Sequence, residues 1–221
     1  MKKICLFLFI VFFCFGWTFA QTQYSCNNLY TIKLPSNLEL QSSELNTVEC
    51  IVQGKSTQTK ISTLSNGIIF QQKGLNADEK SAYSKYCRVI IEYFKEGRND
   101  PVYGRGDQIY VDKEIIDIVH ESVKETCDAS KTPLMKLFTI QPLTINGFPV
   151  LYYSYRRKGW EGKNPPVIVN VYMIYNRYEK VKLTFSYREA EREIWKEAHE
   201  YIMKSFFYKE VLIGKWYLFL F

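Results

Sequence analysis

The sequence predicts an α+β fold in which an antiparallel β-sheet is flanked by helices. Two observations lead to this prediction. Runs of alternating or continuous apolar residues are joined by short turns, as in hairpin-connected strands. In other segments apolar residues recur at intervals of three and four, as in amphipathic helices. Such helices bury one face each, so we expect them to pack on the faces of the sheet.

The first 20 residues have the pattern of a secretory signal peptide. Two lysines precede an apolar run from Ile4 to Phe19, and the small residue Ala20 follows it. The run is short for a membrane anchor, which needs about 20 apolar residues. We therefore expect cleavage after Ala20 and export of the mature chain to the periplasm or the cell exterior, without a transmembrane span.

Residues 21–221 are expected to form one domain, because single cores commonly reach about 200 residues. Removal of Lys2 and Lys3 lowers the formal net charge from +6 to +4. So small a charge on so long a chain does not indicate a nucleic-acid partner.

The residues before the first expected helix predict short strands. "YTIKLPSNLELQ" alternates on either side of Pro35, which favours two extended pieces and a bend. Residues 42–60 are polar and predict a loop with one strand. In "KISTLSNGIIFQQKG", Asn66 and Gly67 readily adopt the positive φ angles of a tight turn, which predicts a hairpin.

Three segments predict amphipathic helices. The first runs from Ala77 to Gly97, the second from Asp112 to Thr126, and the third from about Glu189 to Phe207. Asp112 is the expected N-cap of the second helix, and Gly97 the expected end of the first. The first helix is predicted from the spacing of Tyr83, Tyr86, Cys87, Ile90, Ile91 and Phe94.

The region between the second and third helices is rich in strands. "LFTIQPLTINGFPVLYYSYRRKG" contains an Asn-Gly turn signal, and "PPVIVNVYMIYNRYEKVKLTFSY" contains two long strands joined near Asn176. Residues 167–175 are apolar on both faces, so this strand should be central and covered above and below. In the next strand Val181, Leu183, Phe185 and Tyr187 point one way, and Lys182, Thr184 and Ser186 point to a wetter face.

This order of elements resembles the PsbP-like, or DcrB-like, α/β/α sandwich of exported bacterial proteins. The motifs that carry the resemblance are "YTIKLPSNLEL", "IIFQQKGLN", "INGFPVLYYSYRR" and "IYNRYEKVKLTFSYREAEREIW". They span nearly the whole mature chain up to about Tyr208. The resemblance implies the fold, and a protein that binds partners or has no assigned activity; it supplies no catalytic residues.

Four cysteines remain after residue 20: Cys26, Cys50, Cys87 and Cys127. An even number in an oxidising compartment allows two disulfides, in any of three pairings. The alternative is that Cys87 and Cys127, on apolar helix faces, are reduced core residues.

The sequence indicates no catalytic residue, metal site or cofactor. His120 and His199 each precede a glutamate, but a zinc motif needs a second histidine one turn later, where Lys124 and Met203 stand. Both histidines are therefore expected at the surface or at helix ends. No activated serine or cysteine is recognisable.

Arg105-Gly106-Asp107 is a tripeptide that integrins recognise, but its glycines are equally explained as turn formers. Adhesion through it would require a loop that projects into solvent.

The candidate binding residues are Tyr153, Tyr155, Arg157 and Trp160, on a strand that leads into a Gly- and Pro-rich loop. Tyrosine, tryptophan and arginine are the residues that most often anchor interfaces. The alternative is that both tyrosines are ordinary sheet residues and that Trp160 packs its own loop.

Residues 208–221 form an apolar C-terminal tail that ends in "KWYLFLF". Its last six residues extend only about 20 Å as a strand and cannot cross a bilayer of about 30 Å. We expect the tail to dock on the domain; the alternatives are an edge that pairs with another chain, or a reading frame that ends differently from its relatives.

Together these features predict a non-catalytic binding or accessory module of the bacterial envelope, with an unknown protein or glycan partner. The competing class is a hydrolase or lyase acting on envelope carbohydrate. An enzyme should have a deep cleft with converging titratable groups of shifted pKa, whereas a binding module should have a shallow patch or an exposed sheet face.

Overall fold

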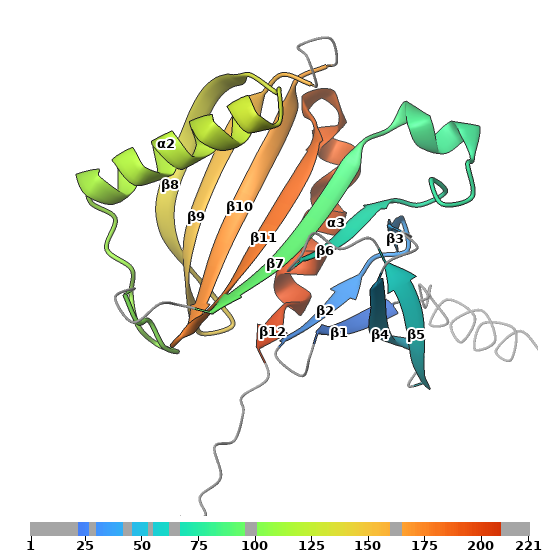
Figure 1. Cartoon of the computed structure of the whole chain (residues 1–221), viewed down its shortest axis with the longest axis horizontal. Coiled ribbons are helices and arrows are strands. Elements are labelled where there is room, and N and C mark those ends of the chain that lie inside the picture. Colours follow the sequence, from blue (N-terminus) through green and yellow to red (C-terminus); the bar gives the residue numbers. More distant parts are fainter. Residues whose placement is uncertain are drawn as a thin grey trace, which may run out of the picture.

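The computed structural model of the chain describes residues 22–26, 30–41, 46–52, 55–61, 67–95, 101–159 and 165–208, with side chains except at Thr22, Cys26, 46–52 and 55–61. Within these ranges the strands form a seven-stranded and a five-stranded sheet, and their pairings are antiparallel. Helices α2 (Lys113–Ala129) and α3 (Arg192–Ser205) lie on opposite faces of the larger sheet (Figure 1). The predicted class, an α+β fold with helices flanking an antiparallel sheet, is confirmed.

The larger sheet has the order β3-β6-β7-β11-β10-β9-β8. Two predicted hairpins are confirmed in it. Asn146 and Gly147 join β8 to β9 with φ angles of 51° and 84°, and Arg177, with a φ of 56°, follows the end of β10 at Asn176. The bounds are β3 (Leu38–Leu40), β6 (Gly67–Gln72), β7 (Cys87–Lys95), β8 (Leu134–Ile145), β9 (Phe148–Arg157), β10 (Val167–Asn176) and β11 (Glu179–Arg188).

The smaller sheet has the order β12-β2-β1-β4-β5. The two extended pieces expected around Pro35 are present as β2 and β3, but they belong to different sheets. The loop with one strand expected at residues 42–60 is instead a pair of strands, β4 and β5. The bounds are β1 (Thr22–Cys26), β2 (Tyr30–Leu34), β4 (Asn46–Val52), β5 (Lys55–Ile61) and β12 (Phe207–Tyr208).

The hairpin predicted around Asn66 and Gly67 is wrong. Strand β5 pairs with β4 in the smaller sheet, whereas β6 begins at Gly67 and pairs with β3 and β7 in the larger one. Asn66 lies outside the described residues. Gly67 meets a different requirement, because a Cβ atom there would lie 3.0 Å from the carbonyl oxygen of Ile91 in the neighbouring strand.

The helix predicted from Ala77 to Gly97 is also wrong. This segment contains a short 3₁₀ helix, η1 (Lys80–Ser84), followed by β7. Cys87, Val89 and Ile91 are buried and alternate with less buried residues, so the strand period fits this run as well as the helical one. Because β7 pairs with β6 on one side and β11 on the other, two ladders of hydrogen bonds favour the strand.

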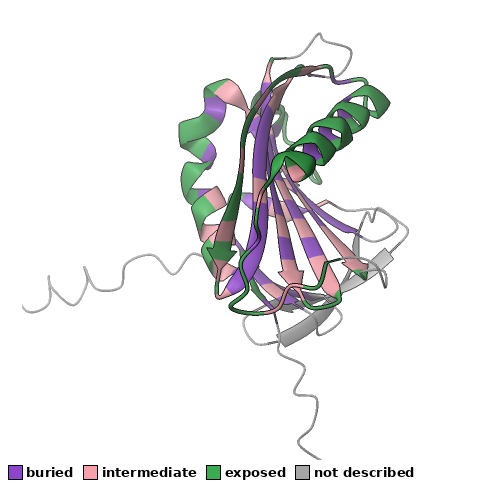
Figure 2. Cartoon of the chain, turned by 90° about the vertical axis from the view of Figure 1, so that its left-hand side faces the viewer, coloured by how far each residue is buried: buried purple, intermediate pink, exposed green. Residues whose placement is uncertain are grey.

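The other two predicted helices are confirmed. The side chain of Asp112 caps α2, since its Oδ1 accepts a hydrogen bond of 3.0 Å from the backbone N–H of Ile115. A single 3₁₀ turn, η3 (Glu189–Glu191), leads into α3. Figure 2 shows the larger sheet between the two helices, with α2 buried along a narrow stripe. Neither helix in the described ranges combines the length and apolar composition that would carry it across a membrane.

Two apolar cores lie on the two faces of the larger sheet. On the α3 face, Trp195, Ala198 and Ile202 pack on β7 and β11, and this core continues into the smaller sheet through residues such as Tyr30 and Ile32. On the α2 face the core is smaller; its members are Ile109, Val119, Val123, Cys127, Leu151, Tyr153, Tyr155, Val167, Val169 and Val171. As its continuous apolar run predicted, β10 is covered on both faces.

Several expectations fall on residues outside this description. They are the signal peptide at 1–20, Trp160, the tail beyond Tyr208, and the side chains of Cys26 and Cys50. Cys87 and Cys127 are described, and both are buried free thiols. Cys127 lies on α2, but Cys87 lies on strand β7 rather than on a helix.

Candidate functional site

A groove of about 270 Å³ lies between α2 and the larger sheet, and we call it the α2 groove. Its wall is the side of α2 that carries Ser122, Val123 and Thr126, together with Ser130, the C-cap that follows the helix. Its floor crosses four strands, and the floor residues are Tyr86, Arg88, Ile90 and Glu92 at β7, Lys182, Thr184 and Ser186 of β11, Val169 and Val171 of β10, and Tyr153, Tyr155 and Arg157 of β9.

Strand alternation explains the chemistry of this floor. In β11, Val181, Leu183 and Phe185 are fully buried towards α3, so the residues between them face the groove. The predicted separation of a wet face from a dry face in this strand is therefore confirmed. In β9 the same alternation brings Tyr153, Tyr155 and Arg157 to the groove, whereas Tyr152 and Ser154 point to the other face.

The groove carries more positive than negative charge. Arg88, Arg157 and Lys182 are cationic, and Glu92 is the carboxylate among the groove residues. Glu92 is paired with Lys182 at 3.1 Å. Two guanidinium groups therefore remain without a carboxylate among the groove residues. Arg88 donates to the side chain of Gln41 at 3.0 Å, and Arg157 to the carbonyl of Lys158 at 3.1 Å.

Of the three tyrosines in the groove, Tyr153 and Tyr155 act as neutral hydrogen-bonding groups. Burial raises the pKa of Tyr155 to about 12, and burial also raises the pKa of Tyr153. Both phenols therefore keep their protons at neutral pH. A phenol can donate a hydrogen bond to an anionic or carbonyl oxygen, so the groove presents donors next to positive charge.

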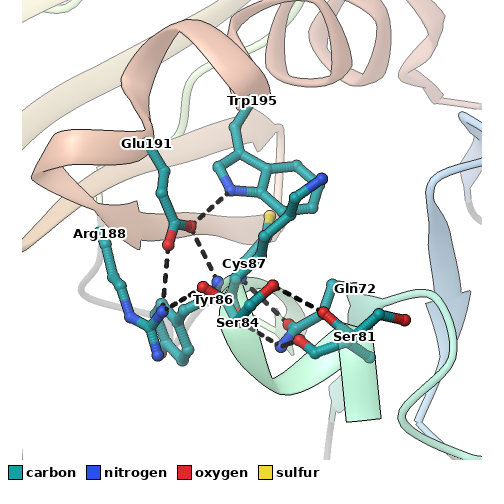
Figure 3. Close-up of polar contacts among 10 residues, drawn as sticks. Gln72, Ser81, Ser84, Tyr86, Cys87, Arg188, Glu191 and Trp195 are labelled. Carbon is teal, nitrogen blue, oxygen red and sulfur yellow. Dashed lines mark hydrogen bonds and ion pairs between the residues drawn. The ribbon is translucent and has the colours of Figure 1, made fainter. Parts of the chain in front are cut away.

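The buried carboxylate of Glu191 holds the backbone in place at the end of the groove where Tyr86 lies. Glu191 accepts hydrogen bonds from the backbone N–H of Tyr86 at 2.8 Å, from Trp195 Nε1 at 3.1 Å and from Arg188 Nη1 at 3.1 Å (Figure 3). Gln72 accepts the next backbone N–H, that of Cys87, at 3.1 Å. These contacts join the start of β7 to the start of α3, and they hold Tyr86 at the rim of the groove.

The structure brings three of the four predicted binding residues together. Tyr153, Tyr155 and Arg157 line one groove, but the tyrosines are 8% and 6% exposed and so lie largely beneath α2. Trp160 lies outside the described residues. Sequence reasoning missed Arg88 and Glu92, because their strand was predicted as a helix. The sequence did indicate the position of Lys182, because the alternation of β11 places this residue on the wetter face of the sheet.

A larger cavity of about 500 Å³ lies on the opposite face of the sheet, and we call it the α3 cavity. Its residues are Phe138, Tyr152, Ser154, Ile168, Asn170 and Tyr187 of the sheet, and Arg192, Glu193, Lys196 and His199 of α3. Sequence reasoning missed this cavity as a whole. Ser154 and Asn170 interrupt apolar strands, which is the signal that could have drawn attention to it.

The two histidines have different surroundings. His120 is exposed on α2, as expected. His199 is partly buried, which corrects the expectation of a surface position: its Nε2 lies 2.9 Å from the hydroxyl of Tyr172, and its ring stacks on Phe185 with centroids 4.4 Å apart. Burial lowers the pKa of His199 to about 4, so the ring is neutral at pH 7. Among the described residues, no group of three or more His, Cys, Asp or Glu could hold a metal.

The Arg105-Gly106-Asp107 loop is tied to its own surroundings. The carboxylate of Asp107 accepts the backbone N–H of Gly104 at 2.6 Å, and the guanidinium of Arg105 lies 5.8 Å from the ring centroid of Phe148. Both charged side chains thus have partners within the fold, so an adhesive role gains no support.

Comparisons with known proteins add information on the fold only. No protein-family model matches the sequence, and no curated protein matches it either. Similar solved structures include the following three. The solution structure of cyanobacterial PsbP from Synechocystis sp. PCC 6803 has 15% sequence identity and a TM-score of 0.49, over 88% of this chain and 96% of that one.

The second is a protein of unknown function from Pseudomonas aeruginosa, with 11% identity and a TM-score of 0.43, over 72% of this chain and 95% of that one. The third is a crystal structure from Bacteroides thetaiotaomicron, with 8% identity and a TM-score of 0.47 over 88% of this chain. The chain spans 50% of the length of that protein. At such identities and TM-scores, none of the three carries an argument about function.

Proposed function

We propose that the chain is an exported binding module of the cell envelope, and that its α2 groove binds an acidic segment of a partner protein. The observation that carries the proposal is the floor of the groove. Three phenols and two guanidinium groups converge there on a site that holds one carboxylate, already paired with Lys182.

Electrostatic complementarity supports an acidic partner. The described groove residues include three cations and one carboxylate, so an approaching carboxylate meets net positive charge and several hydrogen-bond donors. Arginine can hold a carboxylate through two parallel hydrogen bonds, and charge of this kind raises the rate of association as well as the affinity.

The groove favours binding over chemistry. Burial keeps the phenols of Tyr153 and Tyr155 protonated, the carboxylate of Glu92 is paired, and the groove residues include no histidine or cysteine to act as a base or nucleophile. The hydroxyls of Thr184 and Ser186 therefore lie next to no group suited to activate them. Among the described groove residues, the arrangement can hold a ligand but offers no means of cleaving one.

The envelope location is supported by the sequence of residues 1–20, which has the charged, apolar and small-residue parts of a signal peptide. Fractionation of cells that produce the full chain tests it. We expect a protein shortened by about 20 residues in the envelope or medium fraction, and an uncleaved cytoplasmic product would contradict export.

Binding is tested with two fluorescein-labelled peptides of the same apolar residues, one rich in Asp and Glu and the other rich in Lys. We expect fluorescence anisotropy to report binding of the acidic peptide alone, and binding that weakens with added salt. Arg157→Glu should weaken it by roughly tenfold or more, because it replaces an attractive charge with a repulsive one.

The matched control is Lys73→Glu, which changes the net charge equally at an exposed site outside the groove. Equal weakening by both variants would mean that only the overall charge matters, and it would overturn the groove as the site. If the acidic peptide does not bind and an acidic polysaccharide does, the proposed protein partner is wrong and the partner is a glycan.

A further inference from the structure

We propose that the α3 cavity is a second binding site, for a small hydroxylated ligand that carries a carboxylate, such as a hexuronic acid. The site lies on the opposite face of the larger sheet from the α2 groove, and it does not depend on the function proposed for that groove. The inference combines three features: a buried polar floor, aromatic walls and a cationic rim.

The position of α3 leaves room for the cavity. The buried side chains of α3 pack over β7, β11 and the smaller sheet, so β8 and β9 have less cover on this face. The resulting space of about 500 Å³ falls in the range of about 300–1,000 Å³ that is usual for small-molecule sites.

The floor is polar where the sheet would otherwise be apolar. Ser154 and Asn170 lie directly opposite each other on β9 and β10, and each is 6% exposed. The hydroxyl of Tyr152 donates to Oδ1 of Asn170 at 2.9 Å. Within the described part of the chain, Nδ2 of Asn170 has no hydrogen-bond partner.

An unpaired buried amide costs about 1–3 kcal/mol, so a residue chosen for stability alone would be apolar here. Asn170 is better explained by a ligand oxygen that accepts from it. Because Nδ2 is covered by its neighbours, the ligand reaches it through a small rotation of Asn170 or Tyr152. Ser154, in the same floor, adds a hydroxyl that both donates and accepts.

The walls suit the apolar face of a sugar-like ring. Phe138, Tyr152 and Tyr187 line the cavity, together with Ile168. The side chain of Phe138 is 43% exposed at the mouth, although it is a large apolar group. Apolar and aromatic walls with a few fixed polar groups are the usual composition of a small-molecule site.

The rim supplies the preference for a carboxylate. Arg192 and Lys196 are four residues apart on α3, both are exposed, and both line the cavity. Arg192 is also the first residue of the 14-residue helix, where the helix dipole favours an anion. Glu193 is the acidic residue of the rim, so net positive charge remains.

The proposal is tested with D-glucuronate and D-galacturonate, compared with D-glucose and with benzoate, in isothermal titration calorimetry. We expect at least one uronate to bind, glucose to bind roughly tenfold or more weakly because it lacks the carboxylate, and benzoate to bind weakly because it lacks the hydroxyls. Binding of neither uronate, or equal binding of benzoate, would overturn the proposal.

Two variants then locate the site. Lys196→Glu should weaken uronate binding by about tenfold, whereas Lys204→Glu, on the same helix but outside the cavity, should leave it unchanged. Asn170→Leu should abolish binding and leave the protein folded, since it removes a buried N–H donor without a partner and frees only the hydroxyl of the partly buried Tyr152. Uronate binding that survives both Lys196→Glu and Asn170→Leu would contradict the assignment to this cavity.

Discussion

The two faces of the larger sheet are covered to different degrees. On the α3 face, Trp195 and Ile202 are 2% and 0% exposed, and the core beneath them extends into the smaller sheet. On the α2 face, Val119, Val123 and Cys127 form one narrow stripe, while Ile116 and Ile118 of the same helix are exposed. The α3 face therefore holds the fold together, and the α2 face leaves the polar sides of β7 and β11 uncovered.

This difference in cover explains how one sheet can support both stability and binding. Apolar burial contributes roughly 25 cal/mol per Å², so the larger α3 core supplies more of the stability. Because the α3 core supplies more of the stability, the α2 face can retain arginine, lysine and threonine on neighbouring strands. On the α3 face the polar residues Ser154 and Asn170 lie side by side in the floor of the α3 cavity.

The sharpest contrast is between two neighbours on β11. Leu183 is fully buried towards α3, whereas Thr184 is partly buried and lines the α2 groove. We expect Leu183→Ala to lower the free energy of unfolding by about 3 kcal/mol, through lost burial and a residual cavity. Thr184→Ala should lower it by less than about 1 kcal/mol, because this side chain fills no core.

Urea denaturation followed by far-UV circular dichroism measures both values. Similar losses in the two variants would show that the two faces contribute equally, which contradicts the comparison drawn from burial.

The second effect depends on pH and belongs to the α3 face. Burial lowers the pKa of His199 to about 4 from an ordinary value of 6.5. Between these values the unfolded chain binds a proton that the folded chain does not, so stability falls as the pH drops from about 6.5 towards 4. The loss from this one residue should reach up to about 3 kcal/mol.

The contribution of His199 is isolated by comparing the protein with His199→Gln at pH 7 and pH 4.5. Glutamine can still meet the hydroxyl of Tyr172, but it does not titrate. We expect urea denaturation to show a smaller loss in the variant on acidification. An equal loss in both proteins would assign the whole effect to carboxylates elsewhere.

The third effect concerns Glu191, the buried carboxylate that joins the start of β7 to the start of α3. Glu191→Gln should lower the free energy of unfolding by about 2 kcal/mol, because an amide presents one acceptor oxygen to the three donors that Glu191 satisfies. Glu197→Gln, at an exposed position of α3, is the matched control and should change little. Thermal unfolding distinguishes them, and equal melting temperatures would contradict a stabilising role for this network.

The parts of the fold predicted from sequence are those fixed by local chemistry. Asp112 caps its helix, Asn146 and Gly147 make a turn that requires positive φ, and the alternation of β11 separates Leu183 from Thr184. Each of these depends on residues close together in the sequence, so the pattern alone contains the information.

The parts that were missed depend on partners distant in sequence. Strand β7 has apolar residues at both helical and strand spacing, and its pairing with β6 and β11 decides between them. The α3 cavity brings together Asn170 and Lys196, which lie on different elements and meet only after folding. Of the candidate site, Tyr153, Tyr155 and Arg157 were found because aromatic and basic residues of one strand lead into a Gly- and Pro-rich loop.

The smallest expected effect tests whether α2 can loosen without the sheet. Asp112→Ala removes the N-cap and should lower stability by about 1 kcal/mol, whereas Asp112→Asn keeps an acceptor oxygen and should cost less. Because α2 rests on the smaller core, we expect amide hydrogen exchange to accelerate in α2 and to remain unchanged in β11. Equal acceleration in both elements would mean that α2 and the sheet unfold as one unit, and the α2 face would then be as essential to the fold as the α3 face.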